Sequence, residues 1–283
     1  MIQPTNRVHQ YLQALRDAVL TPAVRRARVL AWRYLGVGNP NELTNFLVAD
    51  SARAIQRLTL RPTLNKEKHI ERQVARFVRE IPIRCQKGFS SAIITGYARS
   101  GKSLLATELA RGHGYHHIGL DLFTRLYYNI KDDELRLYTR KALLNGLLRH
   151  FREGLIIEGD DLISRNRSRQ QGMLPFSLET LQALCGETDV LCYVVGNATA
   201  SAEAKKEGFR RFRETGTCWT SKKTHWDDLE TRAREYIDYN RQIYALANDA
   251  GIPFLEIDPT DFETSLSQIA HAIKREALQR RSR

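Results

Sequence analysis

The chain has 283 residues, which is enough for one large α/β domain or for an ordinary domain with an extension. Its 44 lysines and arginines exceed its 32 aspartates and glutamates and give a formal net charge of +12, which favours polyanionic partners such as nucleotides, phosphorylated metabolites or nucleic acid. No apolar run approaches the ~20 residues that span a bilayer, and the first residues lack a signal-peptide core, so we expect no membrane partner and a cytoplasmic location.

Residues 1–82 are predicted to form an all-helical, basic segment. Apolar residues recur at helical spacing over residues 8–19, and Thr21-Pro22 supplies the N-cap and the first-turn proline of a second helix. Two further helices are predicted over residues 41–60 and 65–81, the last with an apolar stripe. That stripe consists of Ile70, Val74, Phe77 and Val78.

Arginines recur on the predicted outer faces of these helices. They are Arg25, Arg26, Arg28, Arg33, Arg53, Arg57, Arg61, Arg72, Arg76 and Arg79. One interpretation is a surface for nucleic acid or for a protein partner. The alternative, which we favour, is a solvated face on helices packed against the rest of the chain, because charge runs are usually solvated. The segment shows neither aromatic interleaving nor a recognition-helix motif.

Beyond Pro82 the hydrophobic period changes, and five short apolar runs alternate with helical stretches. These runs are residues 91–95, 115–121, 155–158, 190–195 and 253–257. The alternation predicts an α/β fold, a parallel sheet of about five strands with helices on both faces. Ligands of such sheets bind at the carboxyl ends of the strands. We therefore assign residues 83–283 to one α/β domain.

The first run leads into Gly96-Tyr97-Ala98-Arg99-Ser100-Gly101-Lys102-Ser103, which fits the pattern G-x-x-x-x-G-K-[ST] ahead of a helix that continues from Leu104. The glycines let the backbone form a nest whose amides, together with the helix N-terminus, point at one polyphosphate. Lys102 suits the β- and γ-phosphates, and the Ser103 hydroxyl suits Mg²⁺. The motif predicts a site for ATP and Mg²⁺, and the alternative is a glycine-rich turn that carries Lys and Ser by chance.

Carboxylates follow the second and third predicted strands. Asp121 ends the second strand and is predicted to accept the proton of a substrate hydroxyl, with a helix N-cap as the alternative. Glu158 ends the third strand and is followed by Asp160 and Asp161, in a stretch that resembles a short Walker B motif. We favour Asp160 for Mg²⁺ and Glu158 for substrate. The alternative is that one or two of these acids only cap the next helix.

Several arginines near this edge of the sheet are candidates for binding anions. They are Arg125, Arg165, Arg167, Arg210 and Arg213. The first three are predicted to contact an anionic substrate, and the alternative for Arg165 and Arg167 is that they belong to a solvated loop. The last two precede a polar stretch at 215–228 and are predicted to stabilise the transferred phosphoryl group as part of a flap. Their alternative is surface ion pairing with Glu207 and Glu214.

Four aromatic residues near the predicted flap are candidates for stacking on a base. They are Trp219, Trp226, Tyr236 and Tyr239. We favour packing or anchoring of the flap for all four, since aromatic side chains are the main contributors to cores.

Taken together, residues from about 91 to 273 resemble a P-loop kinase of the small-molecule or nucleotide type, a group similar to zeta-toxins, shikimate kinases and polynucleotide kinases. The resemblance rests on the 96–103 motif, on Asp121, on the arginine-rich helix after the fourth strand and on the closing stretch at 236–258. In that family the segment after the last strand lies near adenine. The resemblance therefore implies that Asp258, Pro259 and Thr260 lie beside the base.

The leading hypothesis is an ATP- and Mg²⁺-dependent phosphotransferase that acts on a hydroxyl of a small molecule or nucleotide. A second hypothesis is a 5′-hydroxyl polynucleotide kinase, whose binding to oligonucleotides would depend steeply on salt. A third is a non-catalytic regulator, in which ATP gates the binding of nucleic acid or protein to the helical segment. Architecture alone does not name the acceptor.

Overall fold

The computed structural model describes residues 23–27, 29–30, 40–60, 65–83, 85–97, 99–159, 178–214 and 229–281. Its named helices are α2 (Pro40–Thr59), α3 (Lys66–Glu80), α4 (Lys102–His113), α5 (Asp133–His150), α7 (Leu178–Thr188), α8 (Ala202–Glu214), α9 (Leu229–Asp249) and α10 (Phe262–Arg281), with a 3₁₀ helix η2 (Leu120–Leu126). The strands are β1 (Ala92–Thr95), β2 (His116–Gly119), β3 (Leu155–Gly159), β4 (Leu191–Gly196) and β5 (Phe254–Glu256).

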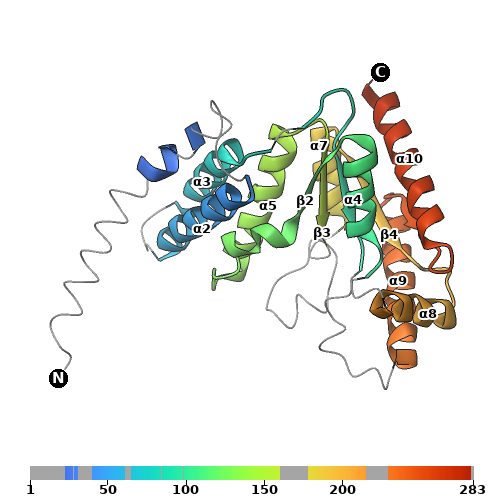
Figure 1. The fold of residues 1–283 in the computed structure, drawn as a ribbon. Coiled ribbons are helices and arrows are strands. Elements are labelled where there is room, and N and C mark those ends of the chain that lie inside the picture. The colour runs from blue at the N-terminus through green and yellow to red at the C-terminus, as the bar shows by residue number, and fades with distance from the viewer. Residues whose placement is uncertain are drawn as a thin grey trace, which may run out of the picture.

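The five strands form one sheet in the order β2-β3-β1-β4-β5, and every neighbouring pair is parallel (Figure 1). The predicted α/β class, with a helical region before the sheet, is confirmed. All five predicted strands are present and begin or end within two residues of their predicted bounds. The second strand ends at Gly119 because the chain turns there into η2, so Asp121 lies in a 3₁₀ helix and not at the strand end.

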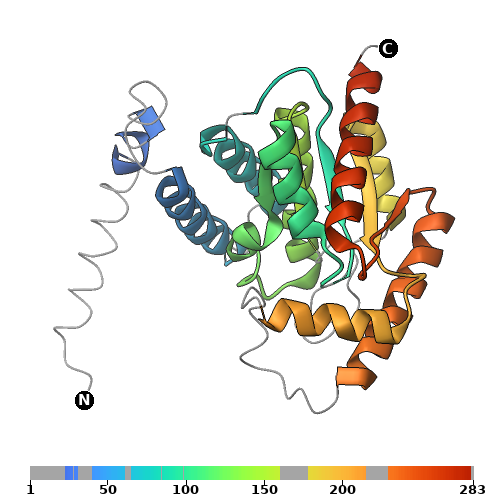
Figure 2. The same cartoon turned by 45° about the vertical axis from the view of Figure 1, so that its right-hand side comes forward.

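Helices cover both faces of the sheet. Alternate strand residues point to opposite faces, so Ile94 of β1 packs with α4 and α10, whereas Ile93 packs with α5, α7 and α9. Figure 2 shows α4 and α10 standing together in front of the strands. The strands are buried on both faces, as expected for a parallel sheet covered by crossover helices.

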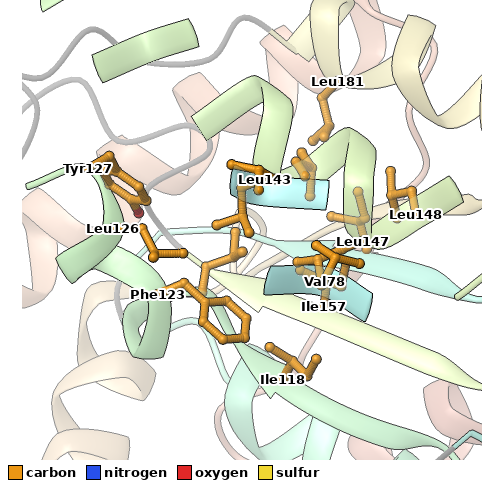
Figure 3. Close-up of a cluster of buried hydrophobic side chains, with 14 of the residues drawn as sticks. Val78, Ile118, Phe123, Leu126, Tyr127, Leu143, Leu147, Leu148, Ile157 and Leu181 are labelled. Atoms are coloured by element: carbon orange, nitrogen blue, oxygen red, sulfur yellow. The ribbon is translucent and has the colours of Figure 1, made fainter. Parts of the chain in front are cut away.

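The helical region shares its core with the sheet. Helix α3 packs on α5, and α2 packs on α3 and η2. Val78 of α3 lies among Leu147 of α5 and Ile157 of β3 (Figure 3). The two helices approach closely at Gly146, where an added Cβ would lie 3.3 Å from Val78 Cγ2. The boundary predicted at residue 82 therefore separates two parts of the chain that share one core.

Helix α3 follows its predicted register. Asn65 is the N-cap, and its side chain accepts a hydrogen bond of 3.1 Å from the Lys68 amide, while Ile81 is the C-cap. The predicted apolar stripe of α3 is confirmed, since its four members are the buried residues of the helix. A sustained 3.6-residue period with a capping residue at its start leaves little freedom in the register of a helix.

Arg25 corrects one prediction about the arginines. We predicted that it lies on an outer face, but only 1% of it is exposed. Its guanidinium bonds to the carboxylates of Asp50 and Glu80 and lies 3.4 Å from Ser51 Oγ. Burial of an arginine requires such partners, because an unpaired charge is costly to remove from water. Arg25 therefore links the helical turn at 23–27 to α2 and α3.

Other arginines of the region are exposed. They are Arg26, Arg53, Arg57, Arg72 and Arg79. Arg28, Arg33 and Arg61 lie outside the described residues. Binding of nucleic acid or of a protein partner by this surface stays a prediction.

Arg25→Met is expected to lower the free energy of unfolding by about 3 kcal/mol, because it removes the buried cation that joins two partly buried carboxylates and leaves them only the more exposed Arg53 and Arg76. Arg53→Met is the control: the Arg53 side chain is 55% exposed and lies 3.8 Å from Asp50, so its loss should cost less than about 1 kcal/mol. Urea unfolding measures both variants, and equal losses would contradict the structural role of Arg25.

Candidate functional site

Residues 96–103, here called the glycine-rich loop, leave β1 at the centre of the sheet and enter α4. Two glycines are required by close approach. A Cβ on Gly96 would collide with the carbonyl oxygen of Val195 in β4. Gly101 adopts a left-handed conformation with φ of 97° as the N-cap of α4, and a Cβ there would lie 2.8 Å from Ile257 Cδ1. Arg99 is also left-handed, with φ of 60°.

Hydrogen bonds within the loop fold it around the N-terminus of α4. The Ser100 amide donates to the Tyr97 carbonyl at 3.2 Å, and Lys102 Nζ donates to the same carbonyl at 3.3 Å. Lys102 is only 7% exposed. Ser100 Oγ is buried and has no hydrogen-bond partner among the described residues, so a polar atom points into this turn unsatisfied. A helix N-terminus, a buried ammonium and an unsatisfied hydroxyl together suit a bound anion.

On the β3 side of the loop stands an acid. Ser103 Oγ donates to Glu158 Oε2 at 3.1 Å, and His117 Nε2 lies 3.7 Å from Glu158 Oε1. Burial alone would raise the pKa of the Glu158 carboxyl, but His117, the charge of Lys102 and the Ser103 hydroxyl outweigh it, so that this pKa is below its ordinary value. Glu158 is therefore an anion at neutral pH, directly beside the loop serine.

On the β4 side of the loop lies a network of amides and one ammonium. Lys205 Nζ of α8 donates to the Arg99 carbonyl at 2.9 Å and to Asn197 Oδ1 at 2.5 Å. The side-chain amide of Asn197 in turn donates to the Ile257 carbonyl at 2.5 Å, and its backbone amide donates to Asn240 Oδ1 at 3.1 Å. The loop is thus tied to the ends of β4 and β5 and to helices α8 and α9.

Aromatic rings hold the outer part of the loop. Tyr97 stacks on Tyr239 at 4.8 Å between ring centroids and meets Tyr236 edge-on at 5.0 Å. The guanidinium of Arg99 lies 5.3 Å from the centre of the Phe209 ring. Tyr236 and Tyr239 therefore pack on the loop, in line with the packing role that we favoured for them, while Trp219 and Trp226 lie outside the described residues.

A cavity of about 410 Å³ opens beside this network. It lies between the turn that follows β4, the end of β5 and the start of α10. Its walls are formed by Thr199, Ala200, Ser201, Ala204, Glu256, Asp258, Pro259 and Ser265. Glu256 orders the turn, because its carboxylate accepts the amides of Ala198 and Thr199 at 3.1 and 2.9 Å.

The segment after β5 forms a tight turn. Asp258 Oδ1 accepts the amide and the hydroxyl of Thr260 at 2.8 and 2.6 Å, and this bonding lowers the pKa of the Asp258 carboxyl. Of the three residues predicted to lie beside the base, Asp258 and Pro259 line the cavity, and Thr260 fixes the orientation of Asp258.

Three further predicted site residues fall within the described ranges, and all three are exposed. Asp121 and Arg125 are exposed on η2, which follows β2 at its carboxyl end. Arg210 is exposed on α8 and lies 3.5 Å from Glu207, the ion pair that we gave as its alternative role. Ala98, Asp160, Asp161, Arg165 and Arg167 lie outside the described residues, as do the side chain of Arg213 and the flap stretch at 215–228.

Sequence reasoning missed the network around Lys205 and Asn197. One signal was available for Lys205, which shares a helical face with Gly208 and Phe209 at spacings of three and four residues. A lysine on the apolar face of an amphipathic helix is a candidate for a buried charge. Asn197 offered only its position directly after a buried strand.

Within the described ranges, histidine, cysteine, aspartate and glutamate form no group of three or more placed to hold a metal ion. The paired oxygens of Ser103 and Glu158 nevertheless suit Mg²⁺, which needs only one or two protein ligands beside water and phosphate oxygens. None of the helices in the described part of the chain has the length and apolar character that crossing a membrane requires.

No protein-family model and no curated protein sequence matches the chain. Among solved structures, it is similar to a candidate kinase from Chloroflexus aurantiacus, with 16% sequence identity and a TM-score of 0.37. That similarity covers 68% of this chain and 100% of the other. Similarity at this level carries no information on chemistry.

Gly96→Ala is expected to destabilise the fold by about 2 kcal/mol, since the new methyl group must displace the backbone of β4. Gly186→Ala is the matched control: its Cβ would meet no atom within 4 Å. That change in α7 should leave stability unchanged or raise it by up to about 1 kcal/mol. Denaturant unfolding compares the two, and a harmless Gly96→Ala would show that the loop does not need this close approach.

Proposed function

We propose that this chain is an ATP- and Mg²⁺-dependent P-loop phosphotransferase that acts on a hydroxyl of a small molecule or nucleotide. The observation that carries the proposal is the glycine-rich loop at the carboxyl edge of β1, with a buried ammonium, an unsatisfied hydroxyl and a helix N-terminus converging on one turn. An acid flanks this turn on one side, and a cavity opens on the other.

The loop is the part that binds the triphosphate. Its backbone amides and the N-terminus of α4 are fixed donors, and they need no reorganisation when a polyanion arrives. Lys102, already held within the turn by the Tyr97 carbonyl, is close enough to exchange that carbonyl for a phosphate oxygen. The Ser100 hydroxyl gains a partner in the same event.

The cavity beside the turn after β4 suits the base. Its volume of about 410 Å³ lies within the range of ~300–1,000 Å³ that is common for small-ligand pockets. Polar atoms of Ser201 and Asp258 line it and would hydrogen-bond ring nitrogens and an exocyclic amine, while the Thr199 hydroxyl in the wall already donates to Glu256. The proposed base site therefore keeps the predicted Asp258, with Thr260 as its support.

The metal is assigned to the acid side of the loop. Ser103 and Glu158 are the described residues that would hold Mg²⁺, directly or through water, together with the predicted Asp160. When bound, Mg²⁺ would neutralise charge on the phosphates.

Transfer is then a displacement at the γ-phosphorus. The acceptor oxygen bonds to that phosphorus, the bond to the β,γ-bridging oxygen breaks, and ADP leaves with the electron pair. Asp121 would accept the proton of the acceptor hydroxyl. Arg125, Arg165 and Arg167 would orient an anionic acceptor, and Arg210 and Arg213 would neutralise the transferred group.

The direct test is incubation of the full chain with γ-labelled ATP, Mg²⁺ and separate pools of metabolites, nucleosides and oligonucleotides. A kinase gives a labelled acceptor in one pool. Label on a 5′-hydroxyl oligonucleotide, with steep salt dependence, would select the polynucleotide kinase. Release of phosphate to water alone, in every pool, would count against a kinase.

Two substitutions should separate binding from transfer. Lys102→Ala is expected to weaken ATP binding by roughly 100-fold, because a charge-assisted contact to phosphate is lost. Asp121→Asn should leave ATP binding nearly intact and reduce transfer by roughly 100-fold or more. Calorimetry measures the first and label transfer the second, with Lys141→Ala as an exposed lysine control. Unchanged turnover in Asp121→Asn would remove Asp121 from its role.

Glu158→Gln tests the metal. The substitution removes the anion but keeps a side chain that can accept from Ser103, so the fold should persist. ATP affinity with Mg²⁺ is expected to fall by roughly tenfold or more, whereas affinity in excess EDTA should change little. Equal changes in both conditions would place the role of Glu158 elsewhere, in the substrate site that we first assigned to it.

A further inference from the structure

Lys205 is a buried cation to which the proposed mechanism gives no part. Only 5% of it is exposed, and among the described residues the carboxylate that acts on it is that of Glu256, through its charge and not through a hydrogen bond. Its ammonium instead donates to two oxygens, the Arg99 carbonyl and Asn197 Oδ1, and lies 5.3 Å from the centre of the Phe209 ring. A buried lysine without a carboxylate partner is unfavourable, so its retention needs a reason.

The contacts of Lys205 reach the apex of the glycine-rich loop. Arg99 adopts a left-handed conformation that costs a non-glycine residue about 1 kcal/mol, and the Lys205 ammonium binds its carbonyl. Of the next two amides, that of Ser100 donates to the Tyr97 carbonyl within the loop, and that of Gly101 belongs to the proposed phosphate nest. The other anchor of Lys205 is rigid, because Asn197 is itself bonded to Ile257 and Asn240.

We propose that Lys205 is a positioning residue, which holds the phosphate-binding turn in shape and couples nucleotide binding to the uptake of a proton. This inference rests on the proposed function, because it needs a polyanion at the loop. The ammonium supports the proposed phosphate nest through its hydrogen bond to the Arg99 carbonyl. It also adds positive charge close to the proposed phosphate site.

The charges around Lys205 explain why a proton is involved. Burial, together with the positive charges of Arg99 and Lys102, lowers the pKa of Lys205 to about 7, while Glu256 of β5 opposes the shift. At pH 8 much of the free protein therefore holds a neutral Lys205. A triphosphate at the loop adds nearby negative charge, which favours the ammonium and raises this pKa.

The sign of the linkage follows from this direction. Because bound nucleotide raises the pKa of Lys205, affinity is full below the pKa of the free protein and declines as pH rises from about 7 towards the higher pKa of the complex. Between these values each unit of pH is expected to weaken binding by up to about tenfold. A lysine that only packs α8 against the sheet would show no such dependence on nucleotide.

The experiment is calorimetry with a non-hydrolysable ATP analogue and Mg²⁺, on the full chain, from pH 7.0 to 9.0 and in two buffers of different ionisation enthalpy. The unmodified protein should take up as much as about one proton per nucleotide at pH 8 and bind more weakly as pH rises. Lys205→Met should abolish proton uptake on nucleotide binding and flatten the pH profile of the affinity. It should also weaken binding at pH 7 by roughly tenfold or more.

Two further variants complete the test. Lys205→Arg stays charged throughout this pH range, so it should bind without proton uptake and with a flat profile. Lys206→Met is the matched control, since the neighbouring Lys206 forms surface ion pairs with Glu203 and Glu230 at 3.4 and 3.6 Å. It should keep the pH profile of the unmodified protein.

Each outcome decides the inference. The inference fails, while the proposed function stands, if the unmodified protein binds the analogue but takes up no proton. It also fails if Lys205→Met or Lys205→Arg shows the same pH profile as the unmodified protein. If the unmodified protein binds no nucleotide at all, the proposed function fails and the inference with it. Thermal unfolding shows whether Lys205→Met folds. If it does not fold, the pH profile and the proton uptake of Lys205→Arg decide the inference.

Discussion

The position of β1 at the centre of a parallel sheet is the constraint on which the rest of the site depends. Its neighbours are β3 and β4, and all three end at the same edge. A loop that leaves β1 there must therefore have Glu158 on one side and Asn197 on the other. The topology of the sheet therefore separates two sets of groups. The oxygen ligands suited to a cation lie on the β3 side of the loop, and the network around the Lys205 ammonium lies on the β4 side.

Packing rather than flexibility gives the loop its shape. The Val195 carbonyl approaches Gly96 so closely that no side chain fits there, and the left-handed backbone of Gly101, against which Ile257 packs, disfavours one at that position. Tyr97 is fixed by stacking on Tyr239 of α9. Contacts from β4, from the segment after β5 and from α9 therefore over-determine a backbone that includes a left-handed residue, which is how strained conformations persist in proteins. A loop held in this manner presents its amides before any ligand arrives, and electrostatic binding requires that preorganisation.

Local patterns were enough to predict the sheet, the glycine-rich loop and the register of α3, because periodicity and capping act within a few residues. The errors and omissions concern partners far apart in the chain. Arg25 meets Glu80, 55 positions away, and Lys205 meets Arg99 across 106 positions. A sequence shows that each is a cation on a helix, but only the tertiary fold supplies its oxygen partners. Asp121 differs again, since a strand that ends two residues early displaced it into a 3₁₀ turn.

The balance of charge at the loop has a physical consequence of its own. Arg99, Lys102 and Lys205 act on one another there, and Glu256 partly offsets their repulsion at Lys205. Such a cluster destabilises the folded protein when no ligand is bound, since like charges in a medium of reduced dielectric repel strongly. A bound polyanion would relieve the same repulsion. The repulsion that lowers the free energy of unfolding would therefore add to the binding affinity. Part of the excess of basic residues in this chain is thus gathered at the glycine-rich loop, where it would favour a polyanion, whereas the exposed arginines of α2 and α3 face solvent.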